Sequence, residues 1–413
     1  MQDRQLYEQI LGIVRPWSVA NVQLDLEAGE VCVTLAHAES ASWPCPECGR
    51  VCPLHDHEPE RTWRHLDTCQ YRTLLAASVP RTDCPEHGVK TVRVSWAEPC
   101  SRFTLLFERL AIDWMQEAGR SAVARRMGLS WEQADRIMQR AVNRGLARRE
   151  QRVFHRIGVD EKSFQKGHEY VTVVCDLDEG HVLYVADARK KESLAAFYEG
   201  LNEEQRAGIK AVAMDMWGPY IQATIEHIPQ GEEKIVFDRF HIAKSLNDAV
   251  DRVRRQEHRE LMRHGNELLK GTKYTWLKNP ENFGFKAWRD FGPLRRSKLR
   301  TARAWALKEM LAGFWDYRSS GVARRFFDRW YSWAIRSRLK PIKKVARSLK
   351  DRLRNLLSYF AHRITNATSE SLNSKIQWIK YTARGFRSRE GFRRAIYFHC
   401  GGLDLHPEPS PTN

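Results

Sequence analysis

The chain has 413 residues, of which 42% are apolar, and a formal net charge of +17. This length is typical of roughly two to four domains, and the 14 Trp and 17 Phe exclude general disorder. The excess of positive charge favours a polyanionic partner, most often nucleic acid, over a membrane surface. No apolar run approaches a spanning helix and the first residues lack a signal-peptide layout, so we expect a cytoplasmic protein without membrane contact.

Cysteine and histidine cluster in the first hundred residues. Strand-like alternation in "EVCVTLAHA" precedes a loop-rich stretch at 43–100. There, "CPECG" supplies Cys45 and Cys48, and "CPEHG" supplies Cys84 and His87 at the same spacing. Two such knuckles present three thiolates and one imidazole, a set suited to tetrahedral, structural Zn²⁺. The sequence therefore predicts a zinc ribbon.

Other ligand sets are compatible with this stretch. Cys52, His55, His57 or Cys69 could replace one ligand, above all His87. Reduced cysteines without a metal are the plainer alternative. Because the four chosen ligands leave no open coordination position, we expect this site to hold a small domain together and to present side chains to DNA.

Residues 103–148 are predicted to be helical. Within them, "GRSAVARRMGLSWEQADRIMQRAVNRGL" combines a short helix, a turn at Gly128 and a longer basic helix. Ser130 can cap the second helix, with Gln133 completing a capping box. The pattern is typical of a DNA-reading helix-turn-helix, with an ordinary helical hairpin as the alternative. The residues expected to face outward and contact DNA are Arg136, Gln139, Arg140 and Arg144.

Residues 156–238 alternate short apolar strands with helical stretches, which predicts an α/β fold with a mixed sheet. Three strands end in an acid, at Asp160, Asp215 and Asp238. Carboxylates gathered at one sheet edge repel one another and need cations, and their hard oxygens suit Mg²⁺ or Mn²⁺. Two such ions would activate a water or a 3′-hydroxyl for phosphoryl transfer. The alternative is a turn or helix cap, above all for Asp215, which precedes a helix.

The stretch 239–364 is predicted to be almost wholly helical. Its part 286–350 carries 19 Lys or Arg against four Asp or Glu, with five Trp among them. This mixture predicts a surface that follows DNA phosphates, or else a Trp core beneath a solvated basic face. Glu370 lies in the first turn of a further helix and could supply a third carboxylate or only complement the helix dipole. The Pro-rich end, 406–413, is expected to be disordered.

Taken in order, "GVDE", "MDMWGPY", "VFDRFHI" and "TNATSESLNSKI", followed by "ARGFR", resemble the DDE transposases of bacterial insertion sequences, of the ISL-three type. The resemblance covers most of the chain. It implies a ribonuclease-H-like catalytic core with a large helical insertion, preceded by the zinc ribbon and the helix-turn-helix. It also implies that Asp160, Asp215 and Glu370 form a catalytic triad that binds two Mg²⁺ or Mn²⁺ ions, with Asp238 and His241 as possible accessory residues.

The resemblance implies a DNA transposase that binds the inverted-repeat ends of its element and catalyses metal-dependent cleavage and strand transfer into target DNA. Alignment of two DNA ends leads us to expect a homodimer or a larger assembly. A metal-dependent nuclease and a DNA-binding regulator with an inactive core are the alternatives. The expected domains are 1–100 with the zinc ribbon, 101–150 with the helix-turn-helix, 151–240 as the first part of the core, 241–364 as the basic helical insertion, 365–400 as the completion of the core, and 401–413 as a disordered tail.

Overall fold

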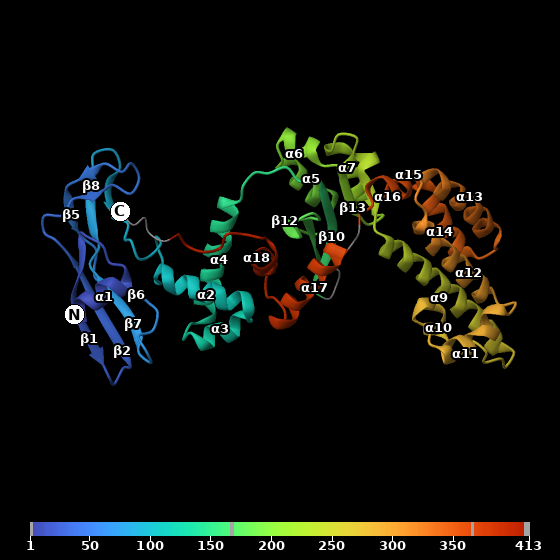
Figure 1. Ribbon diagram of the computed structural model, residues 1–413, viewed down its shortest axis with the longest axis horizontal. Coiled ribbons are helices and arrows are strands. Elements are labelled where there is room, and N and C mark those ends of the chain that lie inside the picture. Colours follow the sequence, from blue (N-terminus) through green and yellow to red (C-terminus); the bar gives the residue numbers. More distant parts are fainter. Residues whose placement is uncertain (1–2, 166–168, 365–366, 409–413) are drawn as a thin grey trace. The chain divides into compact units, whose positions relative to one another are not determined.

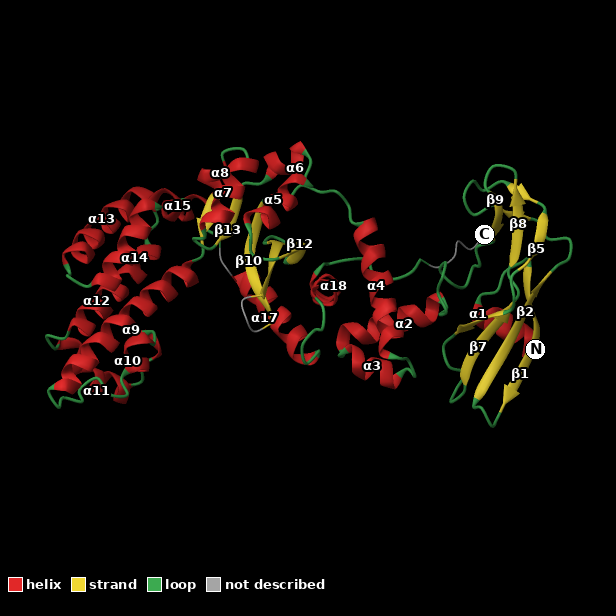
Figure 2. Cartoon of the chain, turned by 180° about the vertical axis from the view of Figure 1, so that it is seen from behind, coloured by secondary structure: helices red, strands yellow, loops and turns green. Residues whose placement is uncertain are grey.

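The computed structural model describes residues 3–165, 169–364 and 367–408. It divides into two compact units (Figures 1 and 2). The first unit holds Met1–Glu150, Ile379–Gly385 and Tyr397–Asn413, and the second holds Gln151–Trp378 and Phe386–Ile396. Across the described ranges, no helix is both long enough and apolar enough to cross a lipid bilayer.

The first unit begins with helix α1 (Asp3–Leu11) and small β-sheets. One sheet has the order β1-β2-β7-β6, and its buried face gathers Trp17, Val33, Trp63 and Leu75 into one core. The stretch 43–100, which was expected to be loop-rich, also contains seven short strands. They escape a periodicity search because most have only two to five residues and many polar side chains. The strands are β1 (Trp17–Asp25), β2 (Glu30–His37), β3 (Trp43–Pro44), β4 (Val51–Cys52), β5 (Leu54–His57), β6 (Arg61–Arg64), β7 (Arg72–Ala77), β8 (Pro80–Cys84) and β9 (Gly88–Thr91).

Three helices complete the first unit's N-terminal part: α2 (Leu105–Glu117), α3 (Arg120–Arg126) and α4 (Trp131–Arg148). The turn between α3 and α4 contains Gly128 at φ +65°, a left-handed conformation that glycine adopts without strain. Ser130 and Gln133 form the predicted capping box at the start of α4. The helix-turn-helix predicted from the sequence is therefore present, and the apolar face of α4 is buried.

The second unit is built on a five-stranded mixed sheet, which confirms the predicted α/β layer. Its order is β12-β11-β10-β13-β14, with antiparallel pairing among the first three strands and parallel pairing of β10 with β13 and β13 with β14. The strands are β10 (Arg156–Gln165), β11 (Glu169–Asp176), β12 (His181–Asp187), β13 (Ala211–Met214) and β14 (Ile235–Phe237). The intervening helices are α5 (Lys191–Glu199), α6 (Glu203–Gly208), α7 (Gly218–His227) and α8 (Gly231–Lys234).

Alternation along β10 separates the two faces of this sheet. Ile157 and Val159 join the core that includes α5 and α7. Gly158 faces α17 (Ala367–Thr382), where a Cβ at Gly158 would lie 3.1 Å from Ser369 Oγ. Phe164 contacts Phe392 of α18 (Arg389–Cys400) on this face. The absence of a side chain at Gly158 thus lets the start of α17 approach the sheet closely.

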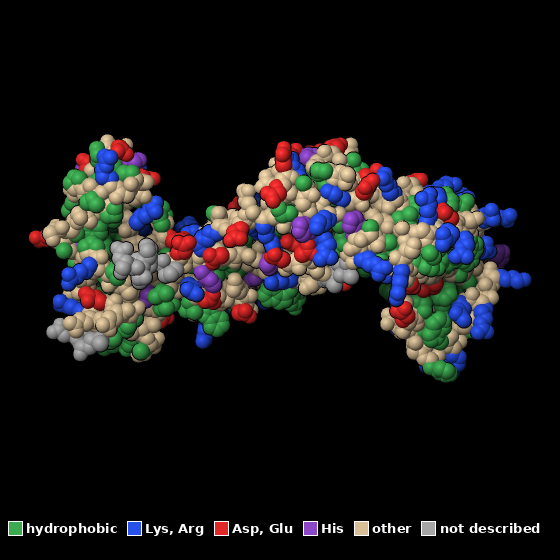
Figure 3. Space-filling view, turned by 45° about the horizontal axis from the view of Figure 1, so that its top comes forward, with side chains coloured by type: hydrophobic (Ala, Val, Ile, Leu, Met, Phe, Trp, Pro, Cys, Tyr) green, Lys and Arg blue, Asp and Glu red, His purple; other side chains and the backbone are tan. Residues whose placement is uncertain are grey.

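Helices α9 to α16 form the predicted helical region after β14. Many of their aromatic side chains pack inward, and Trp276, Phe291, Phe314 and Trp330 are fully buried, whereas Tyr274, Phe285 and Trp333 are exposed. Lys and Arg gather on the visible surface of the same helices (Figure 3). The tryptophans are therefore mainly core, as the plainer alternative held, and the basic residues lie outside them. The helices are α9 (Arg239–Arg263), α10 (Lys273–Leu277), α11 (Phe285–Arg296), α12 (Arg300–Ala312), α13 (Ser320–Arg336), α14 (Lys340–Asp351), α15 (Leu353–Leu357) and α16 (Tyr359–His362), with 3₁₀ turns η1 (Pro280–Asn282) and η2 (Gly313–Asp316).

Candidate active site and metal groups

Three acids form a row across the parallel strands of the second unit. Gly158 of β10 is in register with Ala213 of β13, and Met214 is in register with Phe237 of β14. Continuing that register by one or two residues sets Asp160, in the middle of β10, beside Asp215, and Asp215 beside Asp238. Neighbouring strands lie about 4.8 Å apart, and residues in register share one face. The three acids are therefore neighbours, although the prediction that Asp160 ends its strand is wrong, because β10 continues to Gln165.

Basic and amide side chains contact two of these carboxylates. Asp160 Oδ2 accepts hydrogen bonds from Lys162 Nζ at 2.7 Å and from Asn373 Nδ2 of α17 at 2.8 Å. Asp215 Oδ2 lies 2.9 Å from His241 Nδ1 at the start of α9. Such partners offset the repulsion between neighbouring carboxylates. The row is thus held by groups from three different elements.

The cap alternative holds for Asp238 and fails for Asp215. Asp238 is the N-cap of α9, and its side chain accepts the Phe240 N–H at 2.7 Å. The N-cap of α7 is Trp217, whose side chain makes no capping hydrogen bond, so Asp215 stands outside the helix start. Its half-buried carboxylate has no local backbone role to explain its presence on the sheet edge. Asp238 has such a role and also faces His241 Nε2 at 3.9 Å.

The structure brings His241 into this group more closely than the sequence indicated. The ligand atoms of Asp215, Asp238 and His241 lie within 4.8 Å of one another. Burial alone would lower the pKa of His241, but the hydrogen bond and charge of Asp215, with the charges of Asp238 and Asp160, outweigh it and raise that pKa. Burial raises the pKa of Asp238, although its bond from the Phe240 N–H opposes the shift. A protonated His241 therefore suits the acidic row.

Glu161 is a component of this region that the sequence analysis did not single out. Burial raises the pKa of its carboxyl to about 7, against the opposing charge of Arg189 and with support from the charges of Asp215 and Asp160. Arg189 Nη2 lies 2.9 Å from Glu161 Oε1 and its guanidinium stacks over the Trp217 ring at 4.5 Å. The signal available in the sequence was the second acid of "GVDE". This pair fixes the segment that follows Asp215.

Glu370 lies near the row but is not joined to it. It occupies the first turn of α17 and is exposed, and among the described residues its carboxylate makes no hydrogen bond or ion pair. Asn373, which holds Asp160, is three residues further along the same helix. Side chains at this spacing are neighbours on a helix surface, with Cβ atoms about 5–6 Å apart. The third predicted carboxylate thus stands beside the contact that α17 makes with Asp160.

The predicted zinc ligands converge in the first unit. The ligand atoms of Cys45, Cys48, Cys84 and His87 all lie within 4.8 Å of one another. Cys48 Sγ is 3.8 Å from Cys84 Sγ, and Cys84 Sγ is 3.5 Å from His87 Nδ1. Two sulfurs on a tetrahedral Zn²⁺ at about 2.3 Å each are about 3.8 Å apart. A hydrogen bond with His87 lowers the pKa of the Cys84 thiol to about 6, against desolvation, which favours the thiolate that binds zinc. The donor set fits structural zinc.

The alternative ligands lie outside that group of four. Cys69 is exposed, His55 Nδ1 lies 3.4 Å from Asp56 Oδ2, and His57 pairs with His37 through their Nε2 atoms at 2.8 Å. Cys52 is the nearest substitute, because it is buried in contact with Cys45 and Cys84. The structure therefore reduces the alternatives for the fourth ligand to Cys52.

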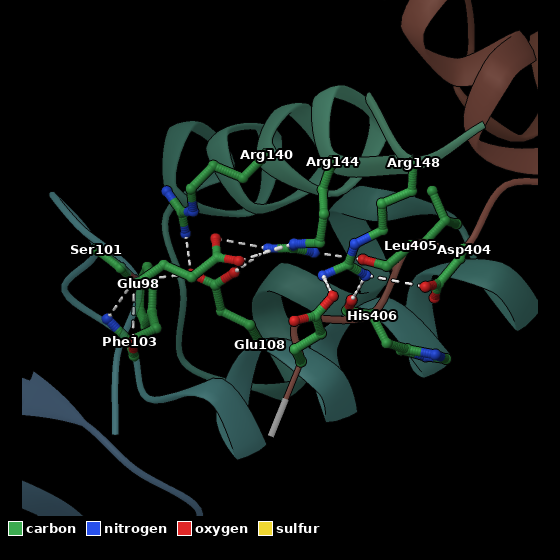
Figure 4. Close-up of polar contacts among 11 residues, drawn as sticks. Glu98, Ser101, Phe103, Glu108, Arg140, Arg144, Arg148, Asp404, Leu405 and His406 are labelled. Atoms are coloured by element: carbon green, nitrogen blue, oxygen red, sulfur yellow. Dashed lines mark hydrogen bonds and ion pairs between the residues drawn. The ribbon is translucent and has the colours of Figure 1, made fainter. Parts of the chain in front are cut away.

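Two of the three arginines expected to contact DNA from α4 are engaged inside the first unit. Arg144 binds both carboxylate oxygens of Glu98, at 2.8 and 2.6 Å, and its side chain is only 8% exposed (Figure 4). Arg140 pairs with Glu108, a carboxylate that is itself buried. A buried carboxylate is costly unless a cation pairs with it. The expectation that Arg144 faces outward is therefore wrong and Arg140 is only partly accessible, whereas Arg136 is exposed.

The expected disorder of the tail is also wrong for residues 401–408. Leu405 is buried and its carbonyl oxygen accepts a hydrogen bond from Arg144, while Arg148 Nη1 donates to His406 O at 2.7 Å (Figure 4). Arg148 also pairs with Asp404 at 2.9 Å. These contacts fasten the segment to α4, because α4 offers cations along one side. Residues 409–413 lie outside the described residues.

A helix-turn-helix, a Cys/His group suited to zinc and a row of acids on an α/β sheet together define a class of proteins that act on DNA. Comparisons with known proteins narrow this class. Residues 157–396 match the model of a DDE transposase family of ISL3 type. Residues 41–87 match the zinc-finger of transposases IS204, IS1001, IS1096 and IS1165, and residues 92–142 match the helix-turn-helix domain of transposase family ISL3.

Full-length relatives agree with these matches. The transposase for insertion sequence element IS1557 of Mycobacterium tuberculosis is 27% identical, over 94% of this chain and 93% of the relative. The transposase for insertion sequence element IS1001 of Bordetella parapertussis is 27% identical, over 95% of this chain and 97% of the relative. The chain belongs to the ISL3 family of DDE transposases.

Proposed function

We propose that this transposase binds the inverted-repeat ends of its insertion sequence and catalyses metal-dependent strand cleavage followed by strand transfer. The observation that carries the proposal is the in-register row of Asp160, Asp215 and Asp238, in a chain that also has a helix-turn-helix. The strand order, with three antiparallel strands followed by two parallel ones, supports a ribonuclease-H-like core.

The proposed catalytic triad is Asp160, Asp215 and Glu370. Asp160 and Asp215 are neighbours in the row, and the bond from Asn373 to Asp160 holds α17, and with it Glu370, beside them. Asp238 is left out of the triad, because its side chain already caps α9. It serves instead to orient His241, which contacts Asp215.

Carboxylate oxygens fit Mg²⁺ or Mn²⁺, and two such ions, when bound, would activate the attacking water or 3′-hydroxyl and stabilise the leaving oxygen. The chain's own residues have defined tasks around that chemistry. Asp160, Asp215 and Glu370 would hold the ions. Lys162 and His241, which lie on Asp160 and Asp215, would exchange those contacts for contacts with the DNA phosphate.

DNA ends would be recognised by the first unit. Among the predicted α4 contacts, we retain Arg136 and Gln139, since Arg136 is exposed and Gln139 is partly exposed. Arg140 and Arg144 would act indirectly, by fixing α4 through their carboxylate partners. The zinc group, with Cys45, Cys48, Cys84 and His87 as ligands, would hold the ribbon in the form that contacts DNA.

Two ends must be aligned for transposition, so we propose a homodimer or larger assembly on DNA. The mass of the protein bound to an end-sequence duplex, measured in solution, tests this part. A complex with one chain on two duplexes would contradict it.

Incubation with end-sequence oligonucleotides, target DNA and Mn²⁺ tests the function itself. A transposase should yield a product in which the element end is joined to the target DNA. Cleavage without joining would identify a nuclease instead. Specific binding without any cleavage would identify a regulator with an inactive core.

A further inference from the structure

A groove of about 260 Å³ opens between α9 and α14, which pack side by side in the second unit (Figure 1). Two cations, Arg252 of α9 and Lys344 of α14, line it, together with the hydroxyls of Ser245 and Ser348. Asp248 is the carboxylate in this lining. Cations with hydroxyl donors are the groups that proteins use to hold phosphate oxygens.

The groove begins at the acidic row. Met216, which follows Asp215 directly, forms one end of its lining. Ser245 Oγ donates to the carbonyl oxygen of His241 at 2.9 Å, one helical turn from the site. Arg252 lies eleven residues beyond His241, roughly 16 Å along α9 at about 1.5 Å per residue. The groove therefore runs away from the row along one side of α9.

The cations of the groove differ from their neighbours on the same helices. Arg254 and Arg255 bind the carboxylate oxygens of Asp251, at 2.7 and 3.0 Å. Among the described residues, Arg252 has no ion-pair partner, although it lies beside them in the sequence, and its side chain is exposed.

Helix α14 shows the same contrast. Lys350 pairs with Asp328 at 2.8 Å. In the described part of the chain, exposed Lys344 has no carboxylate within ion-pair distance. An unpaired cation remains available to an anion from outside, whereas a paired one must first give up its partner.

We propose that this groove binds the sugar-phosphate backbone of the DNA strand that enters the acidic row, with Arg252 and Lys344 on its phosphates and the Ser348 hydroxyl donating to a phosphate oxygen. The inference rests on the proposed function. Asp248 repels phosphate, so the strand's phosphates lie toward the two cations. With about 3.4 Å of rise per nucleotide, the roughly 16 Å from His241 to Arg252 corresponds to about five nucleotides. The contacts therefore fall within about five nucleotides of the cleaved bond.

The salt dependence of end binding tests the groove. Each phosphate contact contributes about 0.9 to the slope of log K against log salt concentration. Arg252→Gln and Lys344→Gln should each lower that slope by about 0.9 and weaken binding. Lys350→Gln is the matched control, since it removes the same charge from α14 but from a paired lysine. Its slope should equal that of the unchanged protein.

Two further measurements locate the contact. Methylphosphonate substitution within five nucleotides of the cleaved bond should weaken binding by the unchanged protein and should not weaken it further in Arg252→Gln. Asp248→Asn should tighten binding, which a misfolded variant would not do. The proposal is contradicted if the salt slopes of Arg252→Gln and Lys344→Gln equal that of the unchanged protein. It is also contradicted if Lys350→Gln lowers the slope as much as the groove variants do.

These outcomes are separate from failure of the proposed function. If the unchanged protein neither binds nor cuts end-sequence DNA, the proposed function fails and the groove loses its ligand. If it binds and cuts normally while both groove variants keep the full slope, the function stands and only the groove is wrong.

Discussion

The zinc group and the acidic row are both clusters of potential metal ligands, but the chain assembles them in different ways. The zinc ligands come from two short knuckles, Cys45–Cys48 and Cys84–His87, and all four ligand atoms lie within 4.8 Å of one another. The acids come from three separate strands and depend on strand register.

This difference has a consequence for what each site can do. The zinc group is complete within the chain, so nothing is left for substrate, and its role is to hold a small domain. The acidic row is incomplete, because Glu370 stands apart and His241 and Lys162 lie on the carboxylates. An incomplete set can rearrange when metal and DNA bind, which is a property of a reaction site. Substitutions in each site can separate these two roles.

Replacement of Asp215 should abolish chemistry and leave binding intact. In Asp215→Asn, cleavage of end-sequence DNA should fall by about 10³-fold or more, because a charge that stabilises the transition state is lost. End affinity and zinc content should not change. Asp187→Asn, at the exposed end of β12 in the same sheet, is the matched control and should cut normally. Full activity in Asp215→Asn would remove Asp215 from the triad.

Loss of the zinc group should weaken DNA binding and leave cleavage intact, the opposite of the result expected for Asp215→Asn. Cys84→Ser should lower the zinc content from one per chain to near zero and weaken end binding by about 10-fold or more, because metal binding is coupled to folding of the ribbon. Single-turnover cleavage at saturating protein should persist. Cys69→Ser, which removes an exposed thiol, serves as control in metal analysis and binding. A loss of cleavage at saturation in Cys84→Ser would contradict the division of roles.

The contact between α17 and the row can be probed at Asn373. Asn373→Ala removes the 2.8 Å donor to Asp160, so cleavage should fall by about 10-fold and half-maximal activity should require more Mn²⁺. Ser374→Ala, which loses only a bond to the Glu370 carbonyl, should cut almost normally. The activity of both variants across a Mn²⁺ titration gives the answer. Equal behaviour of the two would show that α17 does not position the site through Asn373.

The smallest effects on zinc content and DNA binding are expected at the fourth zinc ligand, when one ligand type replaces another. His87→Cys should keep one zinc per chain, and Cys52→Ser should do the same, since Cys52 packs beside the group without belonging to it. End affinity should change by less than about twofold in both. Zinc analysis distinguishes the ligand sets, because loss of metal in Cys52→Ser, with metal retained in His87→Ala, would make Cys52 the ligand.

Much of this protein could be predicted where a feature depends on nearby residues. The capping box of Ser130 and Gln133 and the turn at Gly128 occur where the pattern placed them. The paired knuckles of the zinc group are local in the same sense. The apolar strands of residues 156–238 also followed from composition, whereas the short polar strands between 43 and 91 did not, because they bury too few side chains to produce a period.

The burial of charged side chains and their pairing with distant residues could not be predicted from the sequence. Nothing local distinguishes Arg144, which is buried against Glu98, from exposed Arg136 two turns earlier, since both belong to one basic helix. Likewise, Asp215 and Asp238 follow similar strands, but Asp238 caps a helix whereas Asp215 pairs with His241.

Spacing along the chain was sufficient to predict the zinc ligands, the helix-turn-helix and the acids on the sheet strands of this transposase. Residues within a few positions meet whatever the rest of the chain does, so their spacing is sufficient evidence. The fold, and not the spacing, sets which acids are neighbours and which cations are already paired. It also places two cations that are unpaired within the described chain along a groove beside the row. Those relations depend on strand register and on the burial of charge between distant segments, because a buried carboxylate must find a cation wherever the fold supplies one.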